Sequence, residues 1–401
     1  MRPLSRVEES AGRGVERDSA AHSKVSVSRG RVGRIASIDV LRGLVMALMA
    51  LDHTRDFFGA GSFNPRDVAE PALFLTRWVT HLCAPTFIFL AGLSAFLYGS
   101  GRSVAETSRF LLVRGLCLIL IDFTLIKLGW RFDLDLYRMT AGVIWVIGAS
   151  MVALAALVWL PRWAIAAVAL AMIVGHNLLD GVNAESFGGA AWAWHLLHQP
   201  GRVQLGDWAS IYVLYPLIPW IGVMAAGYAL GPVMQREPDA RQRLLLKLGA
   251  AVTLGFVLLR ATNLYGDPAP WTAQSTWLAT VLSFLNCEKY PPSLLYLMMT
   301  LGPALMLLAA FEHARGWLAA ALATFGQVPF FFYVVHIYLI HALAVAAGVV
   351  ITGALASNPA IGLSLAGIYL IWLAVLVLLY PICRWFAGLK ERGSGWWWSY
   401  I

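Results

Sequence analysis

The chain has 401 residues, of which 59% are hydrophobic and only 13% are charged, and its mean hydropathy is +0.68. A soluble domain is about 45–50% apolar and about 25% charged, so this composition excludes an ordinary soluble enzyme and indicates a membrane protein. The formal net charge of +8 could suggest nucleic-acid binding. The division of basic residues described below explains the charge better, and we expect no nucleic-acid partner.

The first 33 residues are rich in Arg, Ser and Gly and carry few bulky apolar side chains. Such a segment cannot bury a core, so we predict a disordered basic tail over residues 1–33. No apolar segment with a small-residue cleavage site follows it, so we expect no signal peptide. One transmembrane domain is predicted over residues 34–390. A Trp-rich end follows over residues 391–401, and its indole rings favour the membrane interface.

Long apolar runs follow one another from residue 36 onward. A transmembrane helix needs about 20 mostly apolar residues, so the sequence predicts an all-α polytopic membrane protein with about ten spans. The predicted spans are 36–58, 73–99, 107–128, 139–159, 162–180, 208–231, 243–262, 291–311, 321–350 and 362–386. The run 321–350 is longer than one span needs, and we expect it to tilt or break.

Lys and Arg are divided unevenly between the two sides of the membrane. If the N-terminus is cytoplasmic, twenty of them fall on the cytoplasmic side and nine on the outer side. Cytoplasmic loops normally carry this excess, so an even number of spans places both termini in the cytoplasm. Two long outer segments, 181–207 and 263–290, are rich in Trp, His and Asn. They either shape a pocket on the outer face or are simple insertions.

The first predicted span contains charged residues near both of its ends. Asp39 and Arg42 lie three residues apart near the cytoplasmic end, and therefore on one face of the helix. They could form an ion pair that allows the helix to insert. Alternatively, Arg42 could bind an anionic group that enters from the cytoplasm, and the two interpretations are compatible.

At the other end of the same span lie Asp52, His53 and Asp56. A carboxylate beside an imidazole orients its tautomer and raises its basicity, which suits a general base. We therefore predict that His53 is catalytic and that Asp52 or Asp56 orients it. The alternative is an interfacial histidine that only bonds to its neighbours and to water.

Three further residues are candidates for a site. His81 precedes Pro85, and an interrupted helix is tolerated in a membrane only against protein or a water-filled cavity, so His81 either lines an active site or only packs. Lys289 could bind an anionic or sugar substrate, or extend to the interface. His336 lies deep in an apolar run, where a histidine suggests function, here substrate binding, or a bond between helices. His341, five residues further on, lies on another helix face, so we expect no metal.

Several stretches resemble one protein family. RIASIDVLRGLVMALMALDH is similar to the opening signature of the heparan-alpha-glucosaminide N-acetyltransferase catalytic-domain family. The stretches FLTRWVTHLCAPTFIFLAGLSAFL, YVLYPLIPWIGVMAAGYALG, FLNCEKYPPSLLYLMMTLGPALMLL and FGQVPFFFYVVHIYLIHAL resemble its bacterial branch. The similarity extends from about residue 34 to 386. The spacing of Arg42 and His53, R-x10-H, also matches the signature of the broader transmembrane acyltransferase superfamily.

The resemblance implies a function. Members of that superfamily are understood to take an acyl group from cytoplasmic acyl-CoA and deliver it across the membrane. We therefore expect an inner-membrane acyltransferase that uses acetyl-CoA and a sugar or envelope-glycan acceptor, and that could form a homo-oligomer. One departure is that the loop after the first span, GAGSFNPRDVAEPALFLTRW, lacks the histidine of the lysosomal branch. Either His53 or His81 acts instead, or this branch has changed its chemistry. The departure favours direct transfer over an acyl-histidine intermediate.

Two rival functions remain open from the sequence. Intramembrane Asp and His also occur in proton relays, so a small-solute or proton-coupled transporter is the second interpretation. Many transporters contain inverted repeats, and we find no internal symmetry of that kind. The third is a membrane partner without catalysis, because a fold alone does not fix a function.

Overall fold

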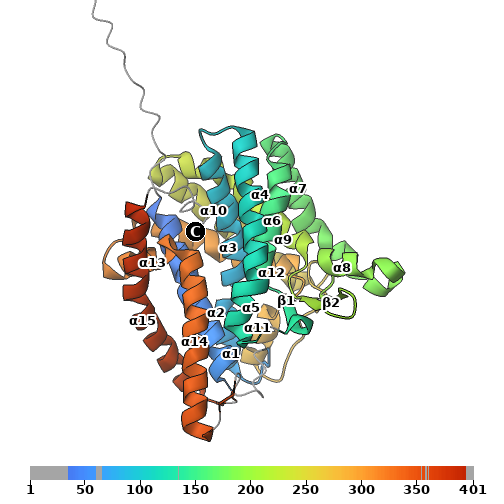
Figure 1. Ribbon diagram of the computed structural model, residues 1–401. Helices are drawn as coiled ribbons and strands as arrows, with labels where there is room; N and C mark the ends of the chain where they lie inside the picture. Colours follow the sequence, from blue (N-terminus) through green and yellow to red (C-terminus); the bar gives the residue numbers. More distant parts are fainter. Residues whose placement is uncertain are drawn as a thin grey trace, which may run out of the picture. The chain divides into compact units, whose positions relative to one another are not determined.

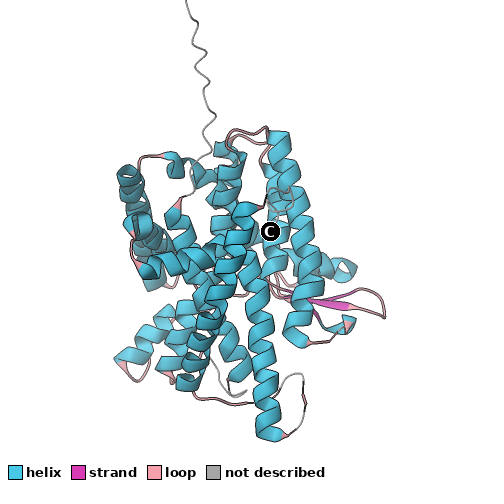
Figure 2. Cartoon of the chain, turned by 60° about the vertical axis from the view of Figure 1, so that its left-hand side comes forward, coloured by secondary structure: helices cyan, strands magenta, loops and turns pink. Residues whose placement is uncertain are grey.

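The computed structural model describes residues 35–59, 66–133, 135–353, 355–356, 359 and 361–393. The predicted tail 1–33 and residues 394–401 of the predicted Trp-rich end lie outside these ranges. The described chain is nearly all-α, as predicted (Figures 1 and 2). Its helices are α1 Ala36–Phe58, α2 Pro71–Thr80, α3 Cys83–Gly99, α4 Val104–Ile121, α5 Lys127–Arg131, α6 Val143–Leu157, α7 Arg162–Gly175, α8 Ala191–Leu197, α9 Leu217–Leu230, α10 Pro238–Thr262, α11 Trp277–Leu285, α12 Leu294–Ala310, α13 Trp317–Gln327, α14 Pro329–Thr352 and α15 Leu365–Arg392.

Seven helical stretches in the described ranges are long and apolar enough to cross a membrane, so the chain is a polytopic membrane protein. They are Pro71–Gly99, Arg162–Leu179, Leu217–Gln235, Pro238–Thr262, Leu294–His313, Pro329–Ile351 and Leu365–Arg392. Helix α6 is apolar but shorter, and α1 contains several charged residues. The predicted number of about ten spans therefore stays a prediction.

Helix α1 is enclosed by other helices rather than by lipid. Sixteen of its 23 residues are buried, and its neighbours include α3, α13, α14 and α15. A Cβ atom on Gly43 would lie 1.8 Å from the carbonyl oxygen of Leu322, and one on Gly326 would lie 1.9 Å from that of Asp39. Glycine at both positions lets the backbones of α1 and α13 touch, and this protein shell allows α1 to contain charged residues.

Replacing Gly326 with alanine is expected to destabilise the protein by about 1–3 kcal/mol, because the added methyl group overlaps the α1 backbone and the two helices must separate. The measurement is the thermal midpoint of the purified protein in detergent. Gly388→Ala in α15 is the matched control, because no atom lies within 4 Å of its added Cβ. Equal midpoints for the two variants would contradict the close contact between α1 and α13.

Three predicted spans have different boundaries in the structure. Strand β1 (Met139–Ala141) opens the span predicted from 139, and β3 (Ser210–Val213) lies in the span predicted from 208. With β2 (Gly201–Gln204) they form a sheet of order β1-β3-β2, in which β3 runs parallel to β1 and antiparallel to β2. Short apolar strands and helix ends look alike in sequence, which explains the error. The run 321–350 breaks at Val328, as expected, and Pro329 begins the new helix.

Candidate active site

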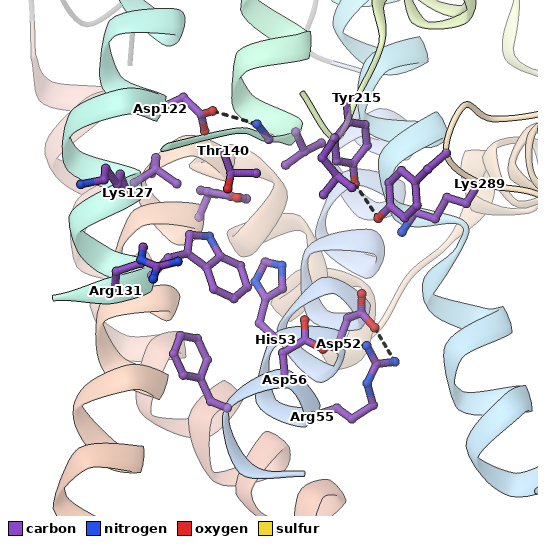
Figure 3. A pocket seen from close by; sticks show the side chains of 18 of the residues that line it. Asp52, His53, Arg55, Asp56, Asp122, Lys127, Arg131, Thr140, Tyr215 and Lys289 are labelled. Carbon is purple, nitrogen blue, oxygen red and sulfur yellow. Dashed lines mark hydrogen bonds and ion pairs between the residues drawn. The ribbon is translucent and has the colours of Figure 1, made fainter. Parts of the chain in front are cut away.

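A cavity of about 510 Å³ lies at the end of α1 that contains His53 (Figure 3). Its wall combines the last turns of α1 with Arg77 of α2, the π-helical turn Asp122–Ile126 and α5. Strand β1, the segment before α9, the loop before α12 and Tyr333 of α14 complete it. Pockets for small ligands usually measure about 300–1,000 Å³, so this one can hold a molecule the size of a sugar unit.

Asp52 is the centre of an ion-pair cluster between α1 and α2. Its Oδ1 lies 2.8 Å from Nη1 of Arg55 and accepts a 3.1 Å hydrogen bond from the Thr80 hydroxyl. Its Oδ2 forms a short ion pair with Arg77. Arg55 also binds Oδ1 of Asp56 at 2.7 Å. Both carboxylates at this end of α1 are therefore engaged by arginines, and Asp52 fastens α1 to α2 through Arg77 and Thr80.

His53 lies on the cavity wall but is not bonded to either carboxylate. Its Nδ1 lies 2.7 Å from Nε2 of His336 in α14. The edge of the ring meets Trp130, with centroids 4.7 Å apart, and Tyr333 at 6.1 Å. We predicted that Asp52 or Asp56 orients His53. In the structure both acids pair with neighbouring arginines, and His336 is the residue that contacts the imidazole.

Lys289 and two tyrosines form another part of the wall. The Lys289 side chain is buried, and its Nζ lies 5.1 Å from the centroid of the Tyr290 ring. The hydroxyl groups of Tyr290 and Tyr215 lie 3.5 Å apart (Figure 3). Burial acts to raise the pKa of Tyr290, but the positive charges of Lys289 and Arg77 outweigh it and lower that pKa below the ordinary tyrosine value. These groups can donate hydrogen bonds to an anionic or hydroxyl-rich ligand.

The wall on the other side of His53 contains Asp122 and several basic side chains. Asp122 accepts a 3.1 Å hydrogen bond from the backbone N–H of Gly142. Lys127 and Arg131 both contact Asp133, at 3.5 and 3.2 Å. In Figure 3 Asp122, Lys127 and Arg131 lie across the cavity from Lys289, so a bound molecule would meet polar groups from two sides.

Four predicted site residues do not line the cavity. Asp39 and Arg42 lie at the other end of α1, where Arg42 contacts Asp39 at 3.3 Å and also donates to Ser94 and to the carbonyl of Gly326. His81 is buried between α2 and α3 against Tyr296. His336 is fully buried behind His53, so its predicted contact with substrate is replaced by a contact with His53.

Sequence reasoning missed several residues of the wall, among them Arg77, Asp122, Trp130, Tyr215 and Tyr290. Arg77 and Asp122 gave a signal that could have been used, because both are ionisable residues inside predicted spans. Such residues are functional candidates by the same rule that selected His53.

Residues 34–262 match the model of a known family, described as heparan-alpha-glucosaminide N-acetyltransferase, catalytic. The chain belongs to this family. The match covers more than half of the chain and confirms the predicted family. A search of curated proteins found no match.

The region that matches the heparan-alpha-glucosaminide N-acetyltransferase family contains most of the cavity wall but not all of it. Helices α1 and α2, Asp122, Trp130 and Tyr215 lie within it. Lys289, Tyr290 and Tyr333 of the wall and His336 behind it come from the chain beyond residue 262. The cavity is therefore assembled from both parts of the sequence.

Proposed function

We propose that the protein transfers an acetyl group from acetyl-CoA to a hydroxyl or amine of a sugar or envelope glycan. Membership in an N-acetyltransferase family supports the reaction type. The observation that carries the proposal is the position of His53, the histidine of the R-x10-H spacing, on the wall of a cavity of about 510 Å³. A base must lie within reach of the proton it removes, and this cavity brings an acceptor to His53.

In the proposed reaction, His53 accepts the proton of the acceptor O–H or N–H while that oxygen or nitrogen bonds to the thioester carbonyl carbon. The carbon–sulfur bond then breaks, and the proton passes from His53 to the CoA sulfur, so the imidazole becomes neutral again. The acetyl group moves directly and forms no bond with the protein. Lys289 and Tyr290 hold the acceptor by hydrogen bonds from the other side of the cavity.

We place the donor and acceptor on opposite sides of a bacterial inner membrane, with both chain termini in the cytoplasm. The excess of Lys and Arg in the loops on the N-terminal side supports this orientation. Arg42, eleven residues before His53, lies about 16 Å away along α1. Arg42 and the basic loops meet the phosphates of acetyl-CoA at the cytoplasmic end, and the acceptor enters the cavity from outside.

The test is acetyl transfer by the purified protein. Protein in detergent is incubated with [14C]acetyl-CoA and a cell-envelope glycan fraction, with glucosamine as a defined amino-sugar probe. We expect label in the glycan or sugar and release of free CoA in equal amount. Acetyl-CoA should also raise the thermal midpoint, since a ligand at 100 times its Kd stabilises by about 2.7 kcal/mol. Neither transfer nor stabilisation would be seen with a transporter of another solute or with a non-catalytic partner.

A further inference from the structure

The contact between His53 and His336 has the geometry of a strong hydrogen bond. The ring planes differ by 15° and the centroids are 5.0 Å apart, while the nitrogens are separated by 2.7 Å. Rings stacked face to face could not bring two nitrogens this close. The rings therefore meet edge to edge in nearly one plane, and the bond lies along the in-plane lone pair.

A second contact fixes which nitrogen donates. Nδ1 of His336 lies 2.9 Å from the backbone carbonyl oxygen of Phe332, one turn earlier in α14. A carbonyl oxygen only accepts, so Nδ1 of His336 must hold the hydrogen. A neutral imidazole has one N–H, so Nε2 of His336 has none and must accept from Nδ1–H of His53. The remaining nitrogen of His53, Nε2, then has a free lone pair.

A doubly protonated His336 would reverse this arrangement, but its surroundings oppose the charge. The His336 side chain has no exposed surface. Across the described ranges, no carboxylate lies within ion-pair distance of it, and its ring faces Phe332 and Tyr333. A buried cation without a partner is costly, so the neutral form is the stable one.

We propose that His336 is a positioning residue that holds His53 in the tautomer with a proton on Nδ1 and a free lone pair on Nε2. The chain of bonds runs from the Phe332 carbonyl through His336 to His53. The tautomer of a histidine is set by the hydrogen bond of its other nitrogen, so this chain determines which nitrogen can accept a proton in the cavity. This inference rests on the proposed function, in which His53 is the base.

Two amide variants of His336 separate positioning from packing. In His336→Gln the side-chain oxygen reaches the position of Nε2 and can still accept from His53. In His336→Asn the shorter amide reaches only the position of Nδ1, beside Phe332. We expect the Gln variant to retain most of its acetyl-transfer activity. The Asn variant should lose about 10- to 100-fold in kcat with unchanged KM for acetyl-CoA. The reason is that the tautomer of His53 with its hydrogen on Nε2, which cannot accept a proton at that nitrogen, becomes populated.

Equal kcat values for the Gln and Asn variants, whether high or low, would overturn the inference. The wild type and His53→Ala, assayed in parallel, distinguish failure of this inference from failure of the proposed function. No transfer by the wild type would refute the proposed function, and full transfer by His53→Ala would refute the role of His53 as the base. A readout that needs no turnover is the rate at which diethyl pyrocarbonate modifies His53, followed by mass spectrometry. The reagent attacks an unprotonated nitrogen, so modification should be slower in the Asn variant than in the Gln variant. The same rate in both would also contradict the proposed bond.

Discussion

Replacing His53 with alanine is expected to lower kcat for acetyl transfer by about 10²- to 10⁴-fold, the usual contribution of a positioned general base. His53 is the histidine on the cavity wall, and its removal leaves the arginine cluster and Lys289 in place. Binding of acetyl-CoA should therefore persist. The measurements are label transfer at saturating acetyl-CoA and the thermal shift caused by acetyl-CoA, both at matched protein abundance.

Two other histidine variants make this result specific. His313→Ala is the matched control, because His313 is half-exposed, lies next to Asp239 and is remote from the cavity. It should transfer acetyl at the normal rate. His81→Ala tests the second histidine that the sequence suggested. A loss of activity in His81→Ala as large as that in His53→Ala, with unchanged stability, would place the chemistry at the α2–α3 junction instead.

Replacing Asp52 with asparagine is expected to destabilise the protein by about 3–5 kcal/mol, the usual cost of removing one partner from a buried ion pair. The side chains of Arg55 and Arg77 are only 9% and 14% exposed. Asparagine keeps the shape of the side chain but removes the negative charge. Arg77 then loses its carboxylate partner, and the bond that fastens α1 to α2 weakens. The measurement is the thermal midpoint in detergent, together with the amount of folded protein in the membrane.

Asp56→Asn is the matched control for this prediction, because it removes the same charge one turn further along α1. The Asp56 side chain is 41% exposed and forms an ion pair with Arg55 of the same helix. Exposed pairs contribute about 0–1 kcal/mol, so this variant should melt close to the wild type. It should also keep its activity if His336, and not Asp56, orients His53. A larger loss of stability in Asp56→Asn than in Asp52→Asn would contradict the cluster described here.

Much of the fold could be predicted because the required signals are local. Apolar runs of sufficient length located the membrane helices, and the proline at 329 follows the break in the run 321–350. The small sheet could not be predicted, because its strands are only three or four residues long. The pairing of β1 with β3 also depends on contacts between segments about 70 residues apart.

The candidate site could be predicted only where it lies on one helix. Asp52, His53 and Asp56 could be grouped from the sequence because they lie within about one turn of α1. Sequence spacing suggested Asp52 or Asp56 as the partner of His53, but it could not show that Arg77 pairs with Asp52 from another helix. His336 was selected as an intramembrane histidine, but no periodicity links it with a residue 283 positions earlier. Contacts of that range arise from tertiary packing.

The residues of α1 contact residues that lie at very different distances along the sequence, and this has a consequence for biosynthesis. Arg77 lies only 25 residues after Asp52, so the ion pair that neutralises much of the charge on α1 can form soon after this helix is made. His336 follows His53 by 283 residues, and a ribosome adding about 5–20 residues per second needs about 14–57 s to reach it. Helices α14 and α15 can complete their packing against α1 only after that delay. The contact between His53 and His336 is therefore completed late, and a chain that stops after the family region contains His53 without this partner.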